Sequence, residues 1–195
     1  SGIKNVHWLQ DFDSVMKSVM AEADTLYVNT NEHTRSSNYL ETRTVRFNRE
    51  MEVKYPAHPR EKSAPILHRI RSVKEKEEIE QMRHACGITK AGFERVLKFV
   101  KPGVMEYEIE AELMHEFLRS RSYGFAYTPI IASGASACVL HYIQNDQECK
   151  DGDVILMDIG AEYGGYASDM TRCFPVNGKF TPRQREVYDS GYKVM

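Results

Sequence analysis

The chain has 195 residues, of which 42% are hydrophobic and 28% charged, and its 26 basic side chains nearly balance 28 acidic ones. These proportions are ordinary for a folded globular protein and exclude wholesale disorder. No apolar run reaches the ~18 residues of a membrane span, and the lack of a basic excess argues against a dedicated nucleic-acid binder. The sequence therefore predicts a folded protein with a local functional site and no nucleic-acid or membrane partner.

The four cysteines are too sparse for a disulfide scaffold; they are Cys86, Cys138, Cys149 and Cys173. No two of them have C-x-x-C spacing, which excludes a zinc ribbon or a thioredoxin-type motif. The first residues, Ser1 to Lys4, do not read as a signal peptide. We therefore expect reduced thiols and a cytoplasmic location.

The N-terminal part reads as a small α/β piece. Apolar residues recur with helical spacing from Phe12 to Ala23, and residues 25–28 then form a short apolar run that predicts a buried strand. Three of the seven prolines fall between Pro56 and Pro65. Because helices and central strands tolerate few prolines, this stretch predicts a linker at 59–66 between one domain at 1–58 and a second at 67–195.

Two helices are predicted after the linker. The first begins with a capping box at Ser72 and Glu75, carries an apolar face from Ile79 to Val100, and ends at residues 101–103, Lys-Pro-Gly. The second has an acidic start and a basic end, which suits the helix dipole; these residues are Glu106, Glu108, Glu110, Glu112, Arg119 and Arg121. We interpret the four glutamates as a solvent-exposed face rather than as a metal site.

The remaining sequence changes to strands punctuated by glycines, at 127–132, 139–142, 154–161 and 166–174. Residues 182–195 then read as the start of another helix. Two helices followed by an antiparallel series of strands predict an α+β fold for this part of the chain.

Two aspartates stand out because aspartate is depleted from strands. Asp158 lies among apolar residues of one predicted strand, and Asp169 lies in the next. A turn at 163–164 would place the two directly opposite, whereas a turn at 164–165 would place them diagonally on the same face, and only a bulge would separate them. Two such close carboxylates repel unless a proton or a metal lies between them, and oxygen ligands suit Mn²⁺ or a similar ion. The alternative is one structural aspartate and one surface aspartate beside a turn.

His141 lies in the short apolar run 139–142, and from this pattern alone a hydrogen-bonded structural histidine is favoured over a functional one. Residues 133–136 lack the G-x-S-x-G spacing of a nucleophile elbow and read as a loop. Neither a P-loop nor a dinucleotide-binding fingerprint is present.

Several segments resemble the proline-specific metallopeptidases, the Xaa-Pro aminopeptidases and Xaa-Pro dipeptidases, which have the pita-bread fold. The similar segments occur in the family's order, at 70–74, 82–85, 139–142, 157–160 and 166–181. The resemblance spans residues 65–195. It implies that 67–195 is the first half of a pita-bread catalytic domain, and that 1–58 is the C-terminal part of an α/β creatinase-type N-domain.

The same resemblance implies roles for three residues. Asp158 corresponds to the first metal-ligating aspartate, Asp169 to the one that bridges both metals, and His141 to a histidine lining the substrate pocket. Two divalent ions, usually Mn²⁺, would hold the water or hydroxide that attacks the carbonyl before proline. A further histidine and two glutamates complete the family's site and are expected downstream of residue 195, so the chain by itself is expected to be inactive. Xaa-Pro peptides are the implied substrates, and a homodimer is the implied assembly.

Two other readings remain open. A creatinase-like hydrolase of the same fold works without metal, and the presence of both aspartates speaks against it. A non-catalytic pita-bread module would bind peptides or proteins, but such a module has no need for adjacent buried carboxylates. The preference between aminopeptidase and dipeptidase is left open by the sequence.

Overall fold

The computed structural model describes residues 2–30 and 40–194, which form two compact units divided between Lys74 and Glu75. The division lies beyond the predicted linker at 59–66, which instead contains a strand and the start of a helix. Pro59 precedes the strand and accepts a backbone hydrogen bond from Leu26, and Pro65 lies in the first turn of the helix. Both positions accept proline because neither needs its missing N–H group.

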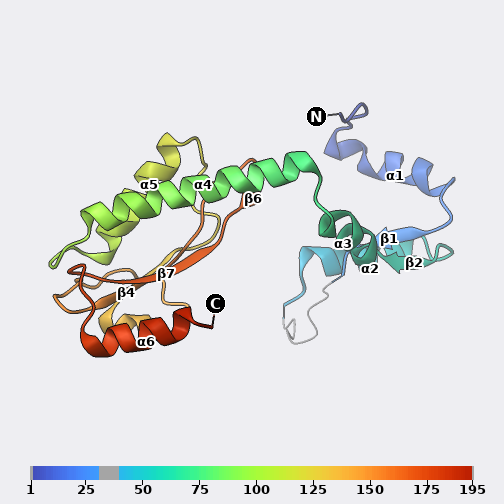
Figure 1. Ribbon diagram of the computed structural model, residues 1–195. Helices are drawn as coiled ribbons and strands as arrows, with labels where there is room; N and C mark the ends of the chain where they lie inside the picture. The colour runs from blue at the N-terminus through green and yellow to red at the C-terminus, as the bar shows by residue number, and fades with distance from the viewer. Residues whose placement is uncertain (1, 31–39, 195) are drawn as a thin grey trace. The chain divides into compact units, whose positions relative to one another are not determined.

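In its described residues, 2–30 and 40–74, the N-terminal unit contains two short parallel strands and three α-helices (Figure 1). Its elements are a 3₁₀ turn η1 (Leu9–Asp11), α1 (Phe12–Met20), β1 (Leu26–Val28), α2 (Arg43–Lys54), β2 (Arg60–Lys62) and α3 (Ala64–Ser72). The predicted helix and strand correspond to α1 and β1. Helix α2 was not predicted from the sequence, because Met51 is its one buried residue and its apolar pattern is weak.

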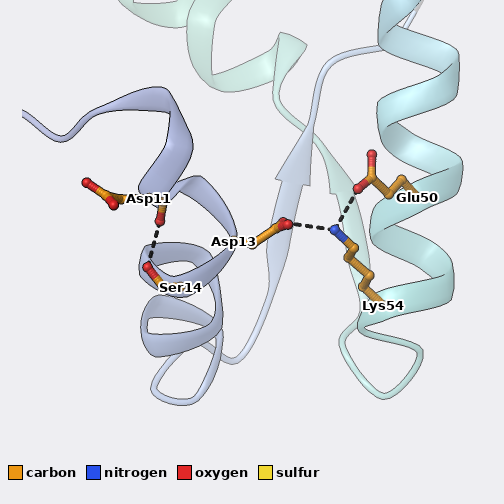
Figure 2. A network of polar contacts seen from close by, with 5 residues as sticks. All are labelled: Asp11, Asp13, Ser14, Glu50 and Lys54. Carbon is orange, nitrogen blue, oxygen red and sulfur yellow. Dashed lines mark hydrogen bonds and ion pairs between the residues drawn. The ribbon is translucent and has the colours of Figure 1, made fainter.

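An exposed polar network connects α1 and α2 in this unit (Figure 2). Lys54 Nζ lies 2.8 Å from Asp13 Oδ1 and 2.6 Å from Glu50 Oε1, while Ser14 Oγ donates to the backbone oxygen of Asp11. Water and salt screen such exposed pairs, so they add little to stability. Among residues 2–30 and 40–74, the buried apolar side chains are few, namely Met20, Val28, Met51 and Ala64.

The C-terminal unit places two helices against an antiparallel sheet in the order β3-β4-β7 (Figure 1). Its elements are α4 (Lys76–Phe99), α5 (Glu106–Arg119), β3 (Ile130–Ser133), η2 (Gly134–Cys138), β4 (Val154–Ile159), β5 (Glu162–Tyr163), β6 (Tyr166–Ala167), β7 (Met170–Pro175) and α6 (Pro182–Tyr192). The chain passes from β4 to β7 through the small β5-β6 hairpin. This arrangement confirms the α+β prediction; Met195, the last residue of the predicted C-terminal helix, lies outside the described residues.

The core of this unit lies between the sheet and the helix pair. Ile155, Met157 and Ile159 of β4 are buried and belong to one cluster with residues of α4 and α5. Because side chains alternate along a strand, Val154, Leu156 and Asp158 point to the opposite face. The apolar packing thus holds one face of β4 and directs Asp158 away from the helices.

The start of the long helix differs from the prediction. Ser72 is the last residue of α3, and α4 begins after Glu75, so the capping box predicted at Ser72 and Glu75 is wrong. The observed box joins Glu75 and Glu78, whose carboxylate accepts the Glu75 backbone N–H at 2.7 Å. A carboxylate serves as well as a hydroxyl here because both accept the unpaired N–H groups of a first helical turn.

The solvent-exposed interpretation of the four glutamates is wrong for Glu106, whose side chain is fully buried. Its Oε1 accepts the N–H of Ser133 at 2.7 Å, and its Oε2 accepts the hydroxyl of Tyr142 at 2.7 Å and the N–H of Gln147 at 3.0 Å. A carboxylate tolerates burial when donors satisfy it in this way. Glu106 therefore ties the start of α5 to β3 and to the segment after η2.

The strand predicted at 139–142 is also wrong. Residues 134–138 form η2, and the chain then turns through His141, whose φ is +53°. Tyr142 is buried, and its hydroxyl donates to Glu106, which connects the turn to the start of α5. Within the described residues, no helix is both long and apolar enough to cross a membrane.

Candidate metal and substrate site

The connection from β4 to β7 determines where the two aspartates lie. Asp158 pairs with Thr171, and Tyr163 pairs with Tyr166, so the turn consists of Gly164 and Gly165. Their φ angles are +59° and +82°, the pair of positive values that a type I′ turn requires and that glycine adopts readily. Of the two turns considered from the sequence, the one at 164–165 is formed, which makes Asp158 and Asp169 diagonal rather than directly opposite. The strand predicted at 166–174 is interrupted, and Asp169 lies in the gap between β6 and β7 rather than in a strand. It directly precedes β7 and still lies on the same side as Asp158, since both carboxylates reach one tyrosine hydroxyl.

The two carboxylates converge on the hydroxyl of Tyr127. This oxygen lies 2.7 Å from Asp158 Oδ1 and 3.1 Å from Asp169 Oδ1. The two Oδ1 atoms can be no farther apart than the sum of these distances, which is inside the reach of about 8 Å expected for diagonal neighbours. Asp158 is half-buried and Asp169 is exposed, so this pair opens towards solvent.

Close packing beside Gly160 holds this arrangement. A Cβ atom at position 160 would lie 1.9 Å from the backbone oxygen of Ser168 and 2.9 Å from a ring carbon of Tyr127. The absence of a side chain at Gly160 thus allows the strand, the Asp169 segment and the tyrosine ring to meet.

Buried hydroxyl groups anchor the same segment to α4. The Thr89 and Ser168 hydroxyl oxygens lie 2.6 Å apart, and the backbone N–H of Ala161 points to both at 2.9 Å. Thr89 belongs to α4, whereas Ala161 and Ser168 flank the β5-β6 hairpin. This contact fixes the backbone of Ser168, which directly precedes Asp169.

The electrostatics of the pair favour a cation. Burial, and then the hydrogen bond to Asp158, raise the pKa of Tyr127, so the phenol stays protonated and acts as a donor. One O–H group carries one proton, which does not neutralise two carboxylates. Within residues 2–30 and 40–194, neither Oδ2 atom of the pair makes a hydrogen bond, so both are available to an ion.

Two converging carboxylates fit part of the coordination shell of a divalent metal ion such as Mn²⁺. Across the described residues, however, no group of three or more His, Cys, Asp and Glu side chains could hold an ion. In the described part of the chain, Asp158 and Asp169 therefore fit a divalent ion but provide only some of the ligands that it needs.

His141 lies outside this pair. Its side chain is exposed on the turn after η2, and within the described residues its imidazole makes no hydrogen bond. The structure thus brings the two predicted metal ligands together, whereas no contact joins His141 to either of them.

Tyr127 was not identified as a site residue from the sequence. It lies in the predicted strand 127–132, but β3 begins only at Ile130, so Tyr127 belongs to the preceding segment. The available signal was indirect: a pair of carboxylates inside a folded domain needs a hydrogen-bond donor. That requirement does not say which of the 11 tyrosines provides it.

Comparison with known proteins gives consistent matches. Residues 80–195 match the sequence profile of metallopeptidase family M24. An Xaa-Pro aminopeptidase of Escherichia coli strain K12 is 47% identical over 125 residues, which are 64% of this chain and 28% of that protein.

Two solved structures extend the similarity over nearly the whole chain. A putative aminopeptidase P from Bacillus anthracis is 35% identical with a TM-score of 0.87, over 97% of this chain and 45% of that one. A zinc-substituted aminopeptidase P from Escherichia coli, in complex with product, is 32% identical with a TM-score of 0.83, over 96% and 43%. The chain thus spans less than half the length of each of these three relatives.

Proposed function

We propose, since this chain belongs to metallopeptidase family M24, that the full-length protein is a metal-dependent Xaa-Pro aminopeptidase. Membership of this family confirms the resemblance to the proline-specific metallopeptidases and the α+β pita-bread fold that it implied. The proposed reaction is hydrolysis of the peptide bond between an N-terminal residue and proline. The observation that carries the proposal is the convergence of Asp158 and Asp169 in a chain whose relatives are named for this activity.

In this proposal Asp158 and Asp169 are the residues of this chain that would hold divalent metal ions. Their free oxygens suit hard to borderline divalent cations, and we propose Mn²⁺. Such ions polarise a carbonyl oxygen and lower the pKa of bound water, which is the chemistry that peptide hydrolysis needs. The task of the chain's own residues is to hold the two carboxylates in register on one face of the sheet, while the remaining ligands come from outside residues 1–195.

We assign substrate contact to His141. The support is its exposed imidazole, carried on a turn that the buried Tyr142 and Glu106 hold in place. A rigid turn can keep an otherwise free side chain available to a ligand.

The organisation of the full-length protein is proposed on the same basis. We propose that residues 1–58 belong to a creatinase-type N-domain and that 67–195 is the first half of the catalytic domain. The similarity to aminopeptidase P structures, which extends through both compact units, supports a two-domain organisation, although the compact units divide between Lys74 and Glu75. A homodimer, a cytoplasmic location and the absence of nucleic-acid or membrane partners complete the proposal.

The decisive experiment measures metal content and peptide hydrolysis in the purified full-length protein. We expect hydrolysis of Xaa-Pro tripeptides, loss of activity after chelation and recovery with Mn²⁺. Asp158→Asn and Asp169→Asn should each lose both metal and activity. Asp151→Asn, which changes an exposed carboxylate in the turn before β4, is the matched control and should retain both.

The rival functions give different results in the same assay. Activity that persists without metal would indicate a creatinase-like hydrolase. Absence of both metal and hydrolysis would indicate a peptide-binding module, and exclusive cleavage of Xaa-Pro dipeptides would indicate a dipeptidase.

A further inference from the structure

We propose that Tyr127 is a positioning residue that holds Asp158 and Asp169 in a metal-ready arrangement before any ion binds. This inference rests on the proposed function, because it assumes that the two aspartates ligate metal. Its basis is the single hydroxyl that lies within hydrogen-bond distance of one oxygen from each carboxylate.

The tyrosine is itself well fixed. Its ring is half-buried against Gly160, at a place where even a Cβ atom would collide with it. Its hydroxyl therefore has little freedom to leave the carboxylates. A donor that is held by packing can orient its acceptors, whereas a mobile side chain would only follow them.

The need for such a donor follows from charge. Two ionised carboxylates at this separation repel each other, and in the absence of a cation their side chains would rotate apart. Tyr127 opposes this rotation because its one proton is shared between the two Oδ1 atoms, at 2.7 Å from the hydroxyl for Asp158 and 3.1 Å for Asp169.

The same contacts leave the metal-facing atoms free. A carboxylate offers about four acceptor positions, and Tyr127 uses one on each aspartate. Both Oδ2 atoms make no hydrogen bond within the described part of the chain. The hydroxyl therefore need not be displaced when an ion binds, so it assists binding rather than competing with it.

The test is a calorimetric titration of the metal-free full-length protein with Mn²⁺. Tyr127→Phe removes one oxygen and keeps the ring against Gly160. We expect the dissociation constant for Mn²⁺ to rise by about 10- to 100-fold, the usual range for loss of a hydrogen bond to a metal ligand. Replacement of Tyr127 by 4-aminophenylalanine restores a donor at the same place and should recover most of the affinity.

Two control variants separate positioning from general stability. Tyr166→Phe removes another tyrosine–carboxylate hydrogen bond of this hairpin, the 2.7 Å contact with Glu78, and Tyr123→Phe changes an exposed tyrosine. Both should bind Mn²⁺ within about threefold of the wild-type affinity, even where Tyr166→Phe lowers the midpoint of thermal unfolding.

The outcomes are distinct. Equal Mn²⁺ affinity in the wild type and Tyr127→Phe, or an equal loss in Tyr127→Phe and Tyr166→Phe, would overturn this inference and leave the proposed function standing. Tighter binding by Tyr127→Phe would show that the hydroxyl competes with the ion, which also overturns it. A wild-type protein that binds no divalent ion would overturn the proposed function itself.

Discussion

His141 combines an exposed imidazole with a left-handed backbone, φ +53°, that few side chains adopt without cost. Asparagine tolerates this conformation, so His141→Asn removes the imidazole without straining the turn. If His141 positions substrate, the full-length enzyme should lose about 10²–10⁴-fold in kcat/KM. Steady-state kinetics and metal analysis of the same preparation check this prediction.

Metal content should stay unchanged in His141→Asn, since no contact joins this residue to the aspartates. His115→Asn, at an exposed position of α5, is the matched control and should keep wild-type kinetics. Full activity of His141→Asn would restore the structural interpretation, and loss of metal would make His141 a ligand or its support.

Glu106 should contribute substantially to the stability of the C-terminal unit. Glu106→Gln replaces one carboxylate oxygen by an NH₂ group, which donates rather than accepts. The N–H of Ser133, or the O–H of Tyr142 together with the N–H of Gln147, then loses its acceptor. Such a loss costs about 2–4 kcal/mol. The midpoint of thermal unfolding should fall by several degrees, whereas Glu148→Gln, at an exposed position, should leave it nearly unchanged.

These residues show what the sequence can predict at this scale. The aspartate pair was predictable, because register and turn chemistry restrict which side chains share a face. Glu106 and Glu108 look alike in the helical pattern, yet only Glu106 is buried, because β3 and Tyr142 close over it. Tyr127 could not be identified either, because its contacts are also distant in sequence: Asp158 follows it by 31 positions and Asp169 by 42.

At the scale of elements, the hairpin between β4 and β7 depends on Gly160. Gly160→Ala would place a Cβ atom 1.9 Å from the Ser168 backbone oxygen, and backbone, unlike a flexible side chain, moves only with its strand. We expect weaker Mn²⁺ binding together with a lower unfolding midpoint, both measured on the full-length protein. Gly87→Ala, where no atom outside the local helical backbone lies within 4 Å of the added Cβ, should instead be neutral or slightly stabilising.

Long elements with strong patterns were predictable, and short ones were not. Helix α5 and strand β4 follow their apolar periodicity closely, since one face of each packs into the same core. Helix α4 follows it only in part, because Ile79 and Cys86 of its predicted apolar face are exposed. The run 139–142 is also apolar, but Val139 and Leu140 are more than half exposed on a turn. The local apolar pattern did not distinguish this turn from a strand, because the hydrogen bond that holds Tyr142 comes from Glu106, which is distant in the sequence.

Across the whole molecule, the cysteines should differ in reactivity. Cys86 and Cys138 are exposed, whereas Cys149 is buried and burial raises the pKa of its thiol to about 11. The thiolate is the reactive form, so at pH 8 Cys149 should react with a thiol reagent only after unfolding. In the full-length protein, Cys86→Ser and Cys138→Ser should each remove one fast-reacting thiol, and Cys149→Ser should remove none.

The same thiol predicts a dependence of stability on pH. The pKa of this thiol in the folded state lies above its ordinary value of 9.0. The contribution of the neutral thiol to the free energy of unfolding is therefore fully present below pH 9 and is lost as the pH rises towards 11. Unfolding midpoints measured between pH 8 and 11 should therefore fall more steeply in the wild type than in Cys149→Ala. Equal slopes would show that this thiol does not titrate as its burial requires.

The two-glycine turn has a consequence for how this hairpin can vary in length among related proteins. If the two-glycine turn is kept, one residue inserted or deleted in the segments between this turn and either aspartate would turn one carboxylate to the opposite side, because successive residues of a strand alternate between faces. Two added residues would restore its side. Insertions and deletions within this hairpin should therefore survive in even numbers, unless a bulge absorbs the odd residue.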